Sequence, residues 1–244
     1  MEAVKLMNRI DTKYVATLDQ LAEILTLAKD VYFAQEIGGE RIADYDTLYF
    51  DTSALSMYTE HHNRHLVRQK VRIRKYIGSP SKEYEGQDLT FLEIKNKNNH
   101  GRTKKKRIEV EDQQVLERPT SEVTSFMEKC CRYEWILLLP ELRTTFRRIT
   151  LVNKQKTERL TIDTRLVWQN QQTKQEKTFD RLAIIELKRD GNSPSPMLGI
   201  MQQLRIHPMK ISKYCVGTAL TNPAVKQNRF KVKIRKIEKL LREH

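Results

Sequence analysis

Much of the chain alternates between apolar and polar residues, the pattern of β-strands with two different faces. Short polar connections separate most of the alternating segments. Seven segments show at least partial alternation: 45–51, 66–76, 89–97, 104–110, 144–152, 158–164 and 182–189. The pattern therefore predicts a β-rich domain whose strands each have one apolar and one polar face.

Three other segments have apolar residues at helical spacing. The first helix is expected over 18–29, where Thr17 and Gln20 fit a capping box at its start. A second is expected over 121–131, after a Pro-Thr pair, and a basic third over 225–241, after an Asn-Pro pair. Together with the strands, these helices indicate an α+β protein.

One predicted strand has an unusual polar face. Arg68, Lys70, Arg72 and Arg74 occupy alternate positions, so a strand places all four cations on one side. A strand exposed to water usually mixes charges of both signs, and like charges in a row repel each other. From this pattern alone, an anion-binding face and a solvated face are equally good interpretations.

In other predicted strands as well, charged residues share a face with each other or with a neighbour of the same parity. These sets are Glu93 with Lys95, Lys105 with Arg107, Phe146 with Arg148, Arg159 with Thr161 and Asp163, and Glu186 with Lys188. Apolar residues fill most of the positions between them. The cationic face therefore comes from as many as six strands.

The two-faced strands predict where the cations lie in the fold. If the apolar faces pack outward against helices, the charged faces line an interior space, because a sheet buries its apolar face. A closed antiparallel β-barrel with flanking helices satisfies this best. Buried cations are costly, so the interior must hold water and normally an anion. Phosphates suit it, because Arg offers a bidentate fork and Lys a point charge.

The composition supports an anionic partner without choosing one. The 244 residues are 39% apolar and carry a formal net charge of +14, which favours nucleic acid, an anionic membrane surface or a phosphate-rich small molecule. The longest apolar run, 135–139, is far shorter than the roughly 20 residues that span a bilayer. The N-terminus also has no apolar signal-peptide core. We therefore expect a cytoplasmic protein without a transmembrane segment.

Two acidic residues interrupt the cationic faces. Glu93 and Glu186 both occur in a Glu-x-Lys context, and hard divalent cations prefer carboxylate ligands. One or both could hold a metal that bridges phosphate oxygens. Glu93 could equally pair with a neighbouring Lys, so it is left out of the expected metal site.

A series of short motifs, in a fixed order, resembles the VTC domain, the catalytic domain of the vacuolar transporter chaperone complex and a branch of the CYTH-like triphosphate tunnel metalloenzymes. The resemblance covers residues 5–220 and depends on the order of the whole series. The motifs are Arg9-x-Asp11-x-Lys13-Tyr14, Tyr49-Phe50-Asp51-Thr52, Tyr58 followed by His61, Lys70-Val71-Arg72-Ile73-Arg74, Glu93-Ile94-Lys95, Arg159-Leu160-Thr161-Ile162-Asp163, Glu186-Leu187-Lys188 and Ser212-Lys213-Tyr214.

The resemblance implies a tunnel of antiparallel strands and an ATP-polyphosphate phosphotransferase. Such an enzyme moves the γ-phosphate of ATP onto a growing inorganic polyphosphate chain, with Mn²⁺ or Mg²⁺ as the divalent metal. Glu186 would hold the metal. Carried onto matching positions, the catalytic phosphate ligands are Lys13, Arg72, Arg74, Lys95, Lys105, Arg148, Arg159, Lys188 and Lys213.

Neighbouring cations make two of these placements ambiguous. Strand parity favours Lys105 over Lys104 and Lys106, and the spacing from Phe146 favours Arg148 over Arg147. Within the set, the phosphates of the nucleotide would be bound by Arg72, Arg74, Lys95, Arg148 and Arg159.

Alternative functions use the same cationic interior. A binding module would keep the cations without turnover, and a hydrolase of tripolyphosphate or nucleoside triphosphates would differ only in using water as the acceptor. Nucleic-acid binding is disfavoured, because the cations face one interior side and no aromatic-rich stacking surface accompanies them. The sequence does not set the oligomeric state.

Two further features concern the periphery of the predicted tunnel domain, residues 1–220. The basic segment 221–244 has apolar residues at helical spacing. It caps one tunnel mouth, as the family's terminal helix does, or meets a membrane surface or an acidic partner; capping is favoured. His61, His62 and His65 form a cluster for which surface or hydrogen-bonding roles are favoured over metal ligation.

Overall fold

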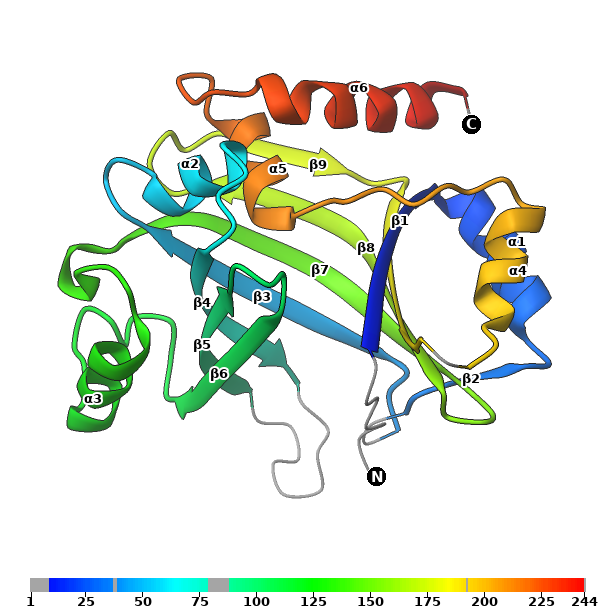
Figure 1. Cartoon of the computed structure of the whole chain (residues 1–244), viewed down its shortest axis with the longest axis horizontal. Helices are drawn as coiled ribbons and strands as arrows, with labels where there is room; N and C mark the ends of the chain where they lie inside the picture. The colour runs from blue at the N-terminus through cyan, green and yellow to red at the C-terminus, as the bar shows by residue number, and fades with distance from the viewer. Residues whose placement is uncertain (1–8, 37–38, 79–87, 192, 244) are drawn as a thin grey trace.

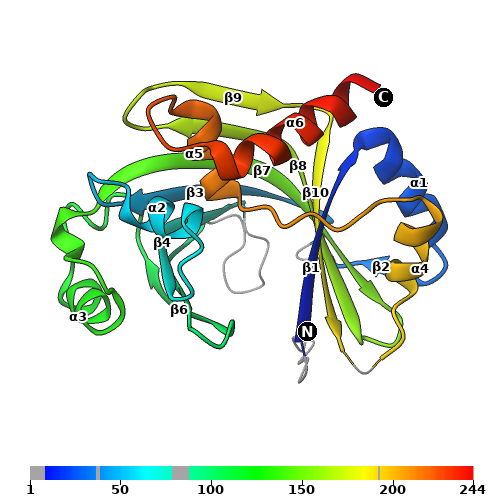
Figure 2. The same ribbon diagram turned by 45° about the horizontal axis from the view of Figure 1, so that its top comes forward.

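A computed structural model describes residues 9–36, 39–78, 88–191 and 193–243. In this part of the chain, ten antiparallel strands form one curved sheet that arches over a hollow (Figures 1 and 2). The main path is β1-β10-β8-β7-β3-β4-β5-β6, while β2 pairs with β7 and β9 with β8. The strands are β1 (Arg9–Thr17), β2 (Tyr32–Ala34), β3 (Ile42–Asp51), β4 (Arg68–Ile77), β5 (Leu89–Lys97), β6 (Thr103–Val110), β7 (Leu139–Asn153), β8 (Glu158–Asn170), β9 (Glu176–Phe179) and β10 (Leu182–Asp190).

Helices pack on both faces of the arched sheet, with α5 on the inner face beside Tyr49. Helices α1 and α4 pack beside β1 and β10, α3 lies outside β4 to β6, and α5 and α6 lie over β7 to β9. The helices are α1 (Leu18–Ala28), α2 (Ser56–His62), α3 (Ser121–Cys130), α4 (Pro196–Gln203), α5 (Lys213–Thr221) and α6 (Asn228–Glu243), with a short 3₁₀ helix η1 (Trp135–Leu137).

The predicted α+β class is confirmed, and so are all seven predicted strands and all three predicted helices. The capping box is present as well: Thr17 accepts a hydrogen bond from the backbone of Gln20, whose side chain accepts one from the backbone of Thr17. The alternation identified the strands because many of them bury apolar side chains on one face and direct polar side chains into the hollow from the other.

Several elements were missed. β1 was seen only as the motif around Lys13, because its outward residues Tyr14 and Ala16 follow a polar stretch that hides the alternation. α5 lacks a polar face altogether: seven of its nine residues are buried, so it shows no helical periodicity. Such a buried helix cannot be recognised from amphipathic spacing.

The predicted closure of the barrel is not confirmed. β1 and β6 stand at the two ends of the sheet and do not pair with each other in the described residues. The segment that leads into α5 lies between β1 and β4 instead. Met209 donates its backbone N–H to the carbonyl of Lys13 on β1 (2.7 Å), and Ser212 accepts a hydrogen bond from Lys70 on β4 (2.7 Å). The segment before α5, which is not a strand, therefore connects β1 to β4 through these hydrogen bonds. A closed barrel would instead need strands that pair with each other at this place.

The apolar faces of the strands point outward, as the alternation predicted. On β4, Val71 and Ile73 are fully buried in a cluster with α3, and on β10, Ile185 and Leu187 are fully buried in a cluster with α1 and α4. The polar faces consequently point into the hollow. Two hydrophobic clusters thus lie outside the arch, while the third, around α5, packs on the same face of the sheet as the cavity-lining Tyr49.

Helix α6 packs through Phe230 and Ile237, both buried, against the cluster that contains α5. The capping of one tunnel mouth by this helix stays a prediction. Residues 1–8 and 244, which belong to the two predicted segments 1–220 and 221–244, lie outside the described residues. No helix in the described ranges is long and apolar enough to cross a membrane.

A substitution at Gly217 of α5 tests how tightly this helix packs on the sheet. A Cβ atom at this position would overlap the indole of Trp168 on β8 and come within 2.7 Å of Leu142 Cδ2 on β7. Since overpacking costs about 1–3 kcal/mol, Gly217→Ala should lower the free energy of unfolding by about that amount, as measured by urea denaturation.

Gly199→Ala is the matched control. Gly199 is exposed in helix α4, and a Cβ there would meet nothing within 4 Å. The alanine should stabilise the protein by about 0.5–1 kcal/mol through helix propensity. Equal effects of the two substitutions would contradict the packing described for α5.

Candidate functional site

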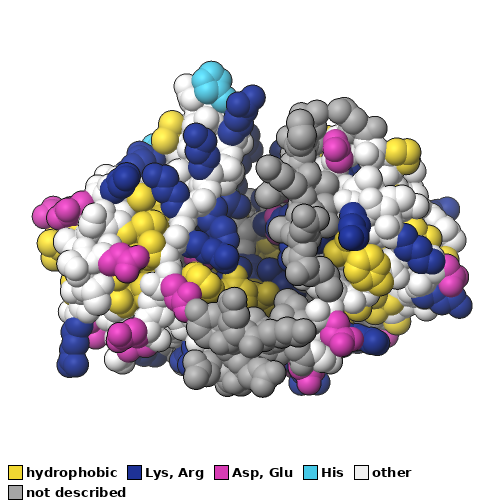
Figure 3. Space-filling view, turned by 90° about the horizontal axis from the view of Figure 1, so that it is seen from below, with side chains coloured by type: hydrophobic (Ala, Val, Ile, Leu, Met, Phe, Trp, Pro, Cys, Tyr) yellow, Lys and Arg dark blue, Asp and Glu magenta, His cyan; other side chains and the backbone are white. Residues whose placement is uncertain are grey.

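The hollow under the arch is a cavity of about 1140 Å³. We call it the cationic cavity, because fifteen of its described lining residues are Lys or Arg and three are Asp or Glu. Lys and Arg side chains are visible in the hollow when the molecule is seen from below (Figure 3). All ten predicted site residues line it: Lys13, Arg72, Arg74, Lys95, Lys105, Arg148, Arg159, Lys188, Lys213 and Glu186. The structure thus brings them together, while their role as ligands stays a prediction.

Strand geometry explains this convergence. Side chains two residues apart on a strand point to the same side, so Arg72 and Arg74 of β4 both reach the cavity. Lys105 lines the cavity, whereas Lys104 and Lys106 on either side do not, in line with strand parity. On β7 the register shifts between Thr145 and Arg147. Beyond this shift, Arg147 and Arg148 pair in regular register with Thr164 and Asp163, and both of them line the cavity.

A first carboxylate, Glu93, holds two of the cations in place. Its Oε2 accepts hydrogen bonds from Nε (2.7 Å) and Nη2 (2.6 Å) of Arg72, and its Oε1 accepts one from Nζ of Lys105 (2.7 Å). Although burial works in the opposite direction, the charges of Arg72, Arg74 and Lys105 lower the pKa of Glu93 to about 2. Glu93 therefore remains ionised and fixes the direction of both cations, which agrees with the expectation that it pairs with a neighbouring Lys.

A second carboxylate, Asp163 of β8, does the same for Arg148 and Lys213. Arg148 binds it in a bidentate manner, from Nε to Oδ1 (2.6 Å) and from Nη2 to Oδ2 (2.8 Å), and Lys213 also donates to Oδ2. Burial raises the pKa of Asp163, but these two cations outweigh it and hold the pKa well below the usual range. The sequence prediction omitted Asp163, although it shares a strand face with Arg159.

Lys213 reaches the cavity because α5 is anchored behind it. The neighbouring Tyr214 donates a hydrogen bond to Asp51, whose carboxylate also accepts from the backbone of Thr52, Met57 and Tyr58. The start of α5 is thereby tied to the turn that begins α2. A buried carboxylate outside the cavity lining thus positions one of the predicted phosphate ligands.

Three further lysines, Lys13, Lys70 and Lys95, line the cavity without a short ion pair to a described carboxylate. Lys70 donates to Ser212 Oγ (2.7 Å) and Lys13 to the carbonyl of Ile211 (3.3 Å). Burial, and then the charge of Lys13, lowers the pKa of Lys95 to about 8. Lys70 was part of the alternating cations of the sequence but not of the predicted site. Its alternation with Arg72 was the signal that could have included it.

Tyr49 was also left out of the prediction. It lines the cavity, and its hydroxyl accepts a hydrogen bond from Nη1 of Arg72 (3.3 Å). Burial would raise its pKa, but Arg72, Arg74 and Lys70 lower it to about 8. Its ring stacks on Tyr214, with centroids 5.2 Å apart. Tyr49 therefore links the position of Arg72 to that of α5.

Glu186 faces Lys13 across the β1–β10 pair, and its Oε2 lies 3.8 Å from Nζ of Lys188. Burial opposes ionisation, but Lys13, Lys188 and Lys95 lower the pKa of Glu186 to about 2. This contact is longer than the ion pairs that Glu93 and Asp163 form with their cations.

A divalent metal fits Glu186 only together with phosphates. Within the described ranges, no group of three or more His, Cys, Asp or Glu side chains could hold a metal ion. One carboxylate among lysines would bind a dication weakly, but phosphate oxygens and water can supply the other ligands. A single carboxylate combined with substrate phosphates is how Mg²⁺ is commonly bound, so the donor set fits a metal that arrives with its phosphates.

The three histidines of the predicted cluster lie at or just after the end of α2. His61 lines the cationic cavity, while His62 Nδ1 lies 3.1 Å from Asn63 Oδ1 and His65 is exposed. The three side chains therefore have different surroundings.

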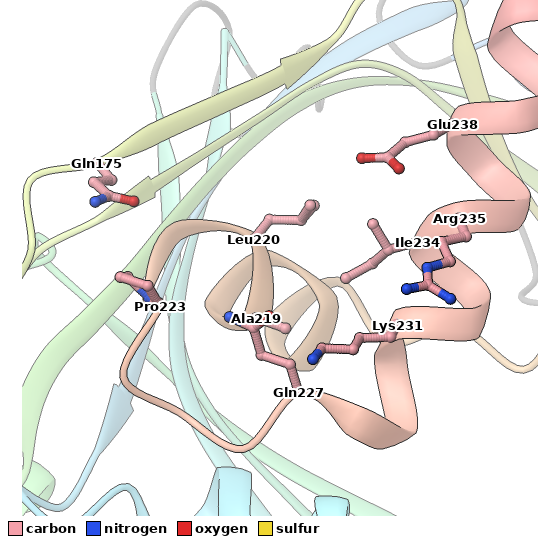
Figure 4. A pocket seen from close by; sticks show the side chains of 9 residues that line it. All are labelled: Gln175, Ala219, Leu220, Pro223, Gln227, Lys231, Ile234, Arg235 and Glu238. Atoms are coloured by element: carbon pink, nitrogen blue, oxygen red, sulfur yellow. The ribbon is translucent and has the colours of Figure 1, made fainter.

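A smaller pocket of about 330 Å³ lies between α5 and α6 (Figure 4). Ala219, Leu220 and Ile234 give it an apolar wall, and Lys231 and Glu238 are among its polar lining residues. It shares no lining residue with the cationic cavity. The phosphate chemistry predicted from the sequence therefore concerns the larger cavity.

Comparison with solved structures relates the fold to known proteins. A protein from Bacillus halodurans, named for adenylate cyclase activity, has a TM-score of 0.52 and 14% identity, and the match covers 92% of this chain and 99% of that one. A chain of the Schizosaccharomyces pombe Mediator head module reaches a TM-score of 0.39 at 10% identity, covering 81% and 90%, too low to support an argument. No curated protein matches. The first likeness shows a shared fold.

The family model of the VTC domain matches residues 8–222. This span contains the whole sheet and every described residue that lines the cationic cavity. The chain therefore belongs to the VTC domain family.

Proposed function

We propose that this VTC domain transfers the γ-phosphate of ATP onto a growing inorganic polyphosphate chain. The observation that carries the proposal is the convergence of fifteen Lys and Arg residues with one central carboxylate, Glu186, on a single cavity. The volume of about 1140 Å³ exceeds the roughly 300–1000 Å³ of most small-ligand pockets. The cavity thus has room for a donor triphosphate and an acceptor chain together.

The reaction needs no protein nucleophile. The terminal oxygen of the acceptor chain attacks the γ-phosphorus, and the bond from that phosphorus to the bridging oxygen of ADP breaks. Negative charge spreads over the transferring group, so fixed cations lower the barrier. Arg72 and Arg148 are suited to this task because Glu93 and Asp163 already fix their orientation. Such preorganisation avoids the cost of ordering the side chains during the reaction.

A divalent metal held by Glu186 would neutralise part of the negative charge of the bound phosphates. The chain's own groups align the two substrates. Lys13, Lys95 and Lys188 surround Glu186, so their ammonium groups can bind the same phosphates from other directions. Positioning and electrostatic stabilisation together account for the proposed catalysis.

The state of the acidic residues favours a phosphate acceptor over water. Water must lose a proton to become a good nucleophile, which calls for a general base with a pKa near the working pH. Glu93 and Glu186 both have pKa values lowered to about 2, and Asp163 is bound by two cations. A terminal phosphate oxygen is already anionic and needs no such base. None of these carboxylates is therefore suited to act as the general base that hydrolysis would need.

Arg72→Ala tests the electrostatic role of the cavity. If this guanidinium acts like a donor of an oxyanion hole, its removal should lower kcat about 10²–10³-fold. ADP release and polymer formation from ATP, Mn²⁺ and a polyphosphate primer are the measurements. Lys106→Ala is the control, because Lys106 is exposed and does not line the cavity. Unchanged turnover in Arg72→Ala would contradict the proposal.

Glu186→Gln tests the metal site. The amide keeps the shape of the side chain but not its charge, so the concentration of Mn²⁺ needed for half-maximal activity should rise, by about tenfold if one charged ligand is worth 1.4 kcal/mol. Binding of long-chain polyphosphate without metal should not weaken, since a negative charge is removed. An unchanged metal requirement would remove Glu186 from the metal site.

The lysines predict a pH dependence of binding. Burial lowers the pKa of Lys95 to about 8, and it lowers that of Lys213 to about 8 despite the charge of Asp163. Both are protonated below pH 8 and lose their charge above it, so the affinity for long-chain polyphosphate should fall as the pH rises through 8. Titration calorimetry measures this. In Lys95→Arg the fall should be shallower, because a guanidinium stays charged; constant affinity across this range would contradict the assignment.

A further inference from the structure

A row of four aromatic rings crosses the sheet beside the cationic cavity. The rings belong to Phe146 of β7, Tyr45 of β3, Tyr76 of β4 and Phe91 of β5, which are consecutive strands of the sheet. Strand register pairs the first with the second and the second with the third. Neighbouring ring centroids lie 5.1, 4.9 and 5.7 Å apart along the row. Spacing along the sequence does not reveal this row, because each ring comes from a different strand.

Arginine side chains lie over three of the four rings. The Cζ atoms of Arg74 and Arg148 lie 5.4 and 4.8 Å from the centroid of Tyr45, and the same two arginines lie over the neighbouring ring of β7. Arg107 lies over the ring of β5, at 4.3 Å. Among the described residues, no cation lies over Tyr76.

The ring of Tyr76 is open to a further aromatic group. Neither of its two ring neighbours lies parallel to it, since the interplanar angles are 56° and 89°. Its side chain is half-buried and lines the cavity. Aromatic rings prefer offset-stacked or edge-to-face partners. A flat ring that enters the cavity can therefore stack on Tyr76.

Apolar residues surround these rings where β4 ends. Ile42, Ala43 and Ile77 line the cavity together with Tyr45 and Tyr76. Ile42 and Ile77 are also exposed, so this end of the cavity is open to solvent. We call these five residues the aromatic end of the cavity.

The charges around the aromatic end are balanced. Two cations, Arg41 and Arg147, and two acids, Glu40 and Asp44, line the cavity here. Arg147 Nε lies 3.1 Å from Asp44 Oδ1, and Arg41 forms an ion pair with Glu36 (3.3 Å). The rest of the described lining contains thirteen cations and one acid. This end therefore suits an uncharged group, whereas the remainder of the cavity suits an anion.

The aromatic end adjoins the predicted phosphate ligands. Arg74 and Tyr76 lie two residues apart on the same face of β4, about 7 Å along the strand. In a nucleoside triphosphate, a ribose separates the phosphates from a flat aromatic base. Such a ligand has the same order of groups as the cavity, with an anionic chain beside an uncharged ring. Inorganic polyphosphate has no group that fits the aromatic end.

We propose that the aromatic end is a base subsite for the donor nucleotide, in which the nucleobase stacks on Tyr76 while the triphosphate reaches Arg74, Arg72 and Arg148. Every nucleobase has a π face, so stacking tolerates different bases. The subsite should therefore distinguish nucleotides from inorganic phosphates more strongly than it distinguishes one base from another. This inference rests on the proposed function, because it takes the phosphate donor to be ATP.

Tyr76→Leu tests the subsite, because it removes the ring and keeps an apolar side chain. Without a divalent metal, its affinity for ATP should fall about tenfold, within the range known for a base stacked on an aromatic side chain. Its affinity for tripolyphosphate should match the wild type, since the cations remain. Tyr76→Phe should keep the affinity for ATP, because the ring is retained. Calorimetric titration at one salt concentration measures these affinities.

Phe33→Leu is the matched control. Phe33 lies on β2, is exposed and does not line the cavity, so this variant should bind both ligands as the wild type does. A loss confined to ATP in Tyr76→Leu, and absent from Tyr76→Phe, supports the base subsite. No loss for ATP, equal losses for ATP and tripolyphosphate, or the same loss in Tyr76→Phe or in the control would each overturn it.

The outcomes separate this inference from the proposed function. If the wild type extends polyphosphate and Tyr76→Leu binds ATP with unchanged affinity, the proposed function stands and the base subsite fails. If Tyr76→Leu shows the expected loss but the wild type forms no polymer from ATP and Mn²⁺, the base subsite stands and the proposed function fails. A wild type that does not bind ATP would overturn both.

Discussion

Repulsion among the cations that line one cavity is the constraint on which the rest of this structure depends. Two buried carboxylates relieve part of it. Glu93 is shared by Arg72 and Lys105, and Asp163 by Arg148 and Lys213, so each acid neutralises one charge while it orients two side chains. The remaining positive charge calls for an anion and for water in the cavity, since uncompensated buried charge is costly. The cations that repel one another are therefore also the groups that can bind an anion.

The fold accommodates this charge by placing its hydrophobic cores elsewhere. Two apolar clusters lie between the outer face of the sheet and its helices, and a third surrounds α5 on the inner face beside the cavity. Burial of apolar surface in these clusters supplies the main favourable term in folding. The interior of the arch can then be specialised for ligands without a loss of core packing. α5 links the two regions, because its buried face packs on Trp168 while Lys213 at its start reaches the cavity.

Phosphoryl transfer suits such an arrangement because it asks for aligned charges and no covalent intermediate with the protein. In this member of the VTC domain family, lysines surround a central carboxylate, and two arginines are held by buried acids.

The sequence by itself determined the strands, the three amphipathic helices and the set of inward-facing cations, because a period of two fixes which side chains share a face. It also identified Glu186, through the ordered motifs of the family resemblance. Tertiary structure decided what local pattern cannot encode. The sheet remains open because the segment before α5, rather than a strand, lies between Lys13 and Lys70. Asp163 and Tyr49 became parts of the site through contacts between distant strands, and α5 was invisible to periodicity because almost all of it is buried. Local spacing sets the direction of a side chain, and only the assembled fold sets its partners.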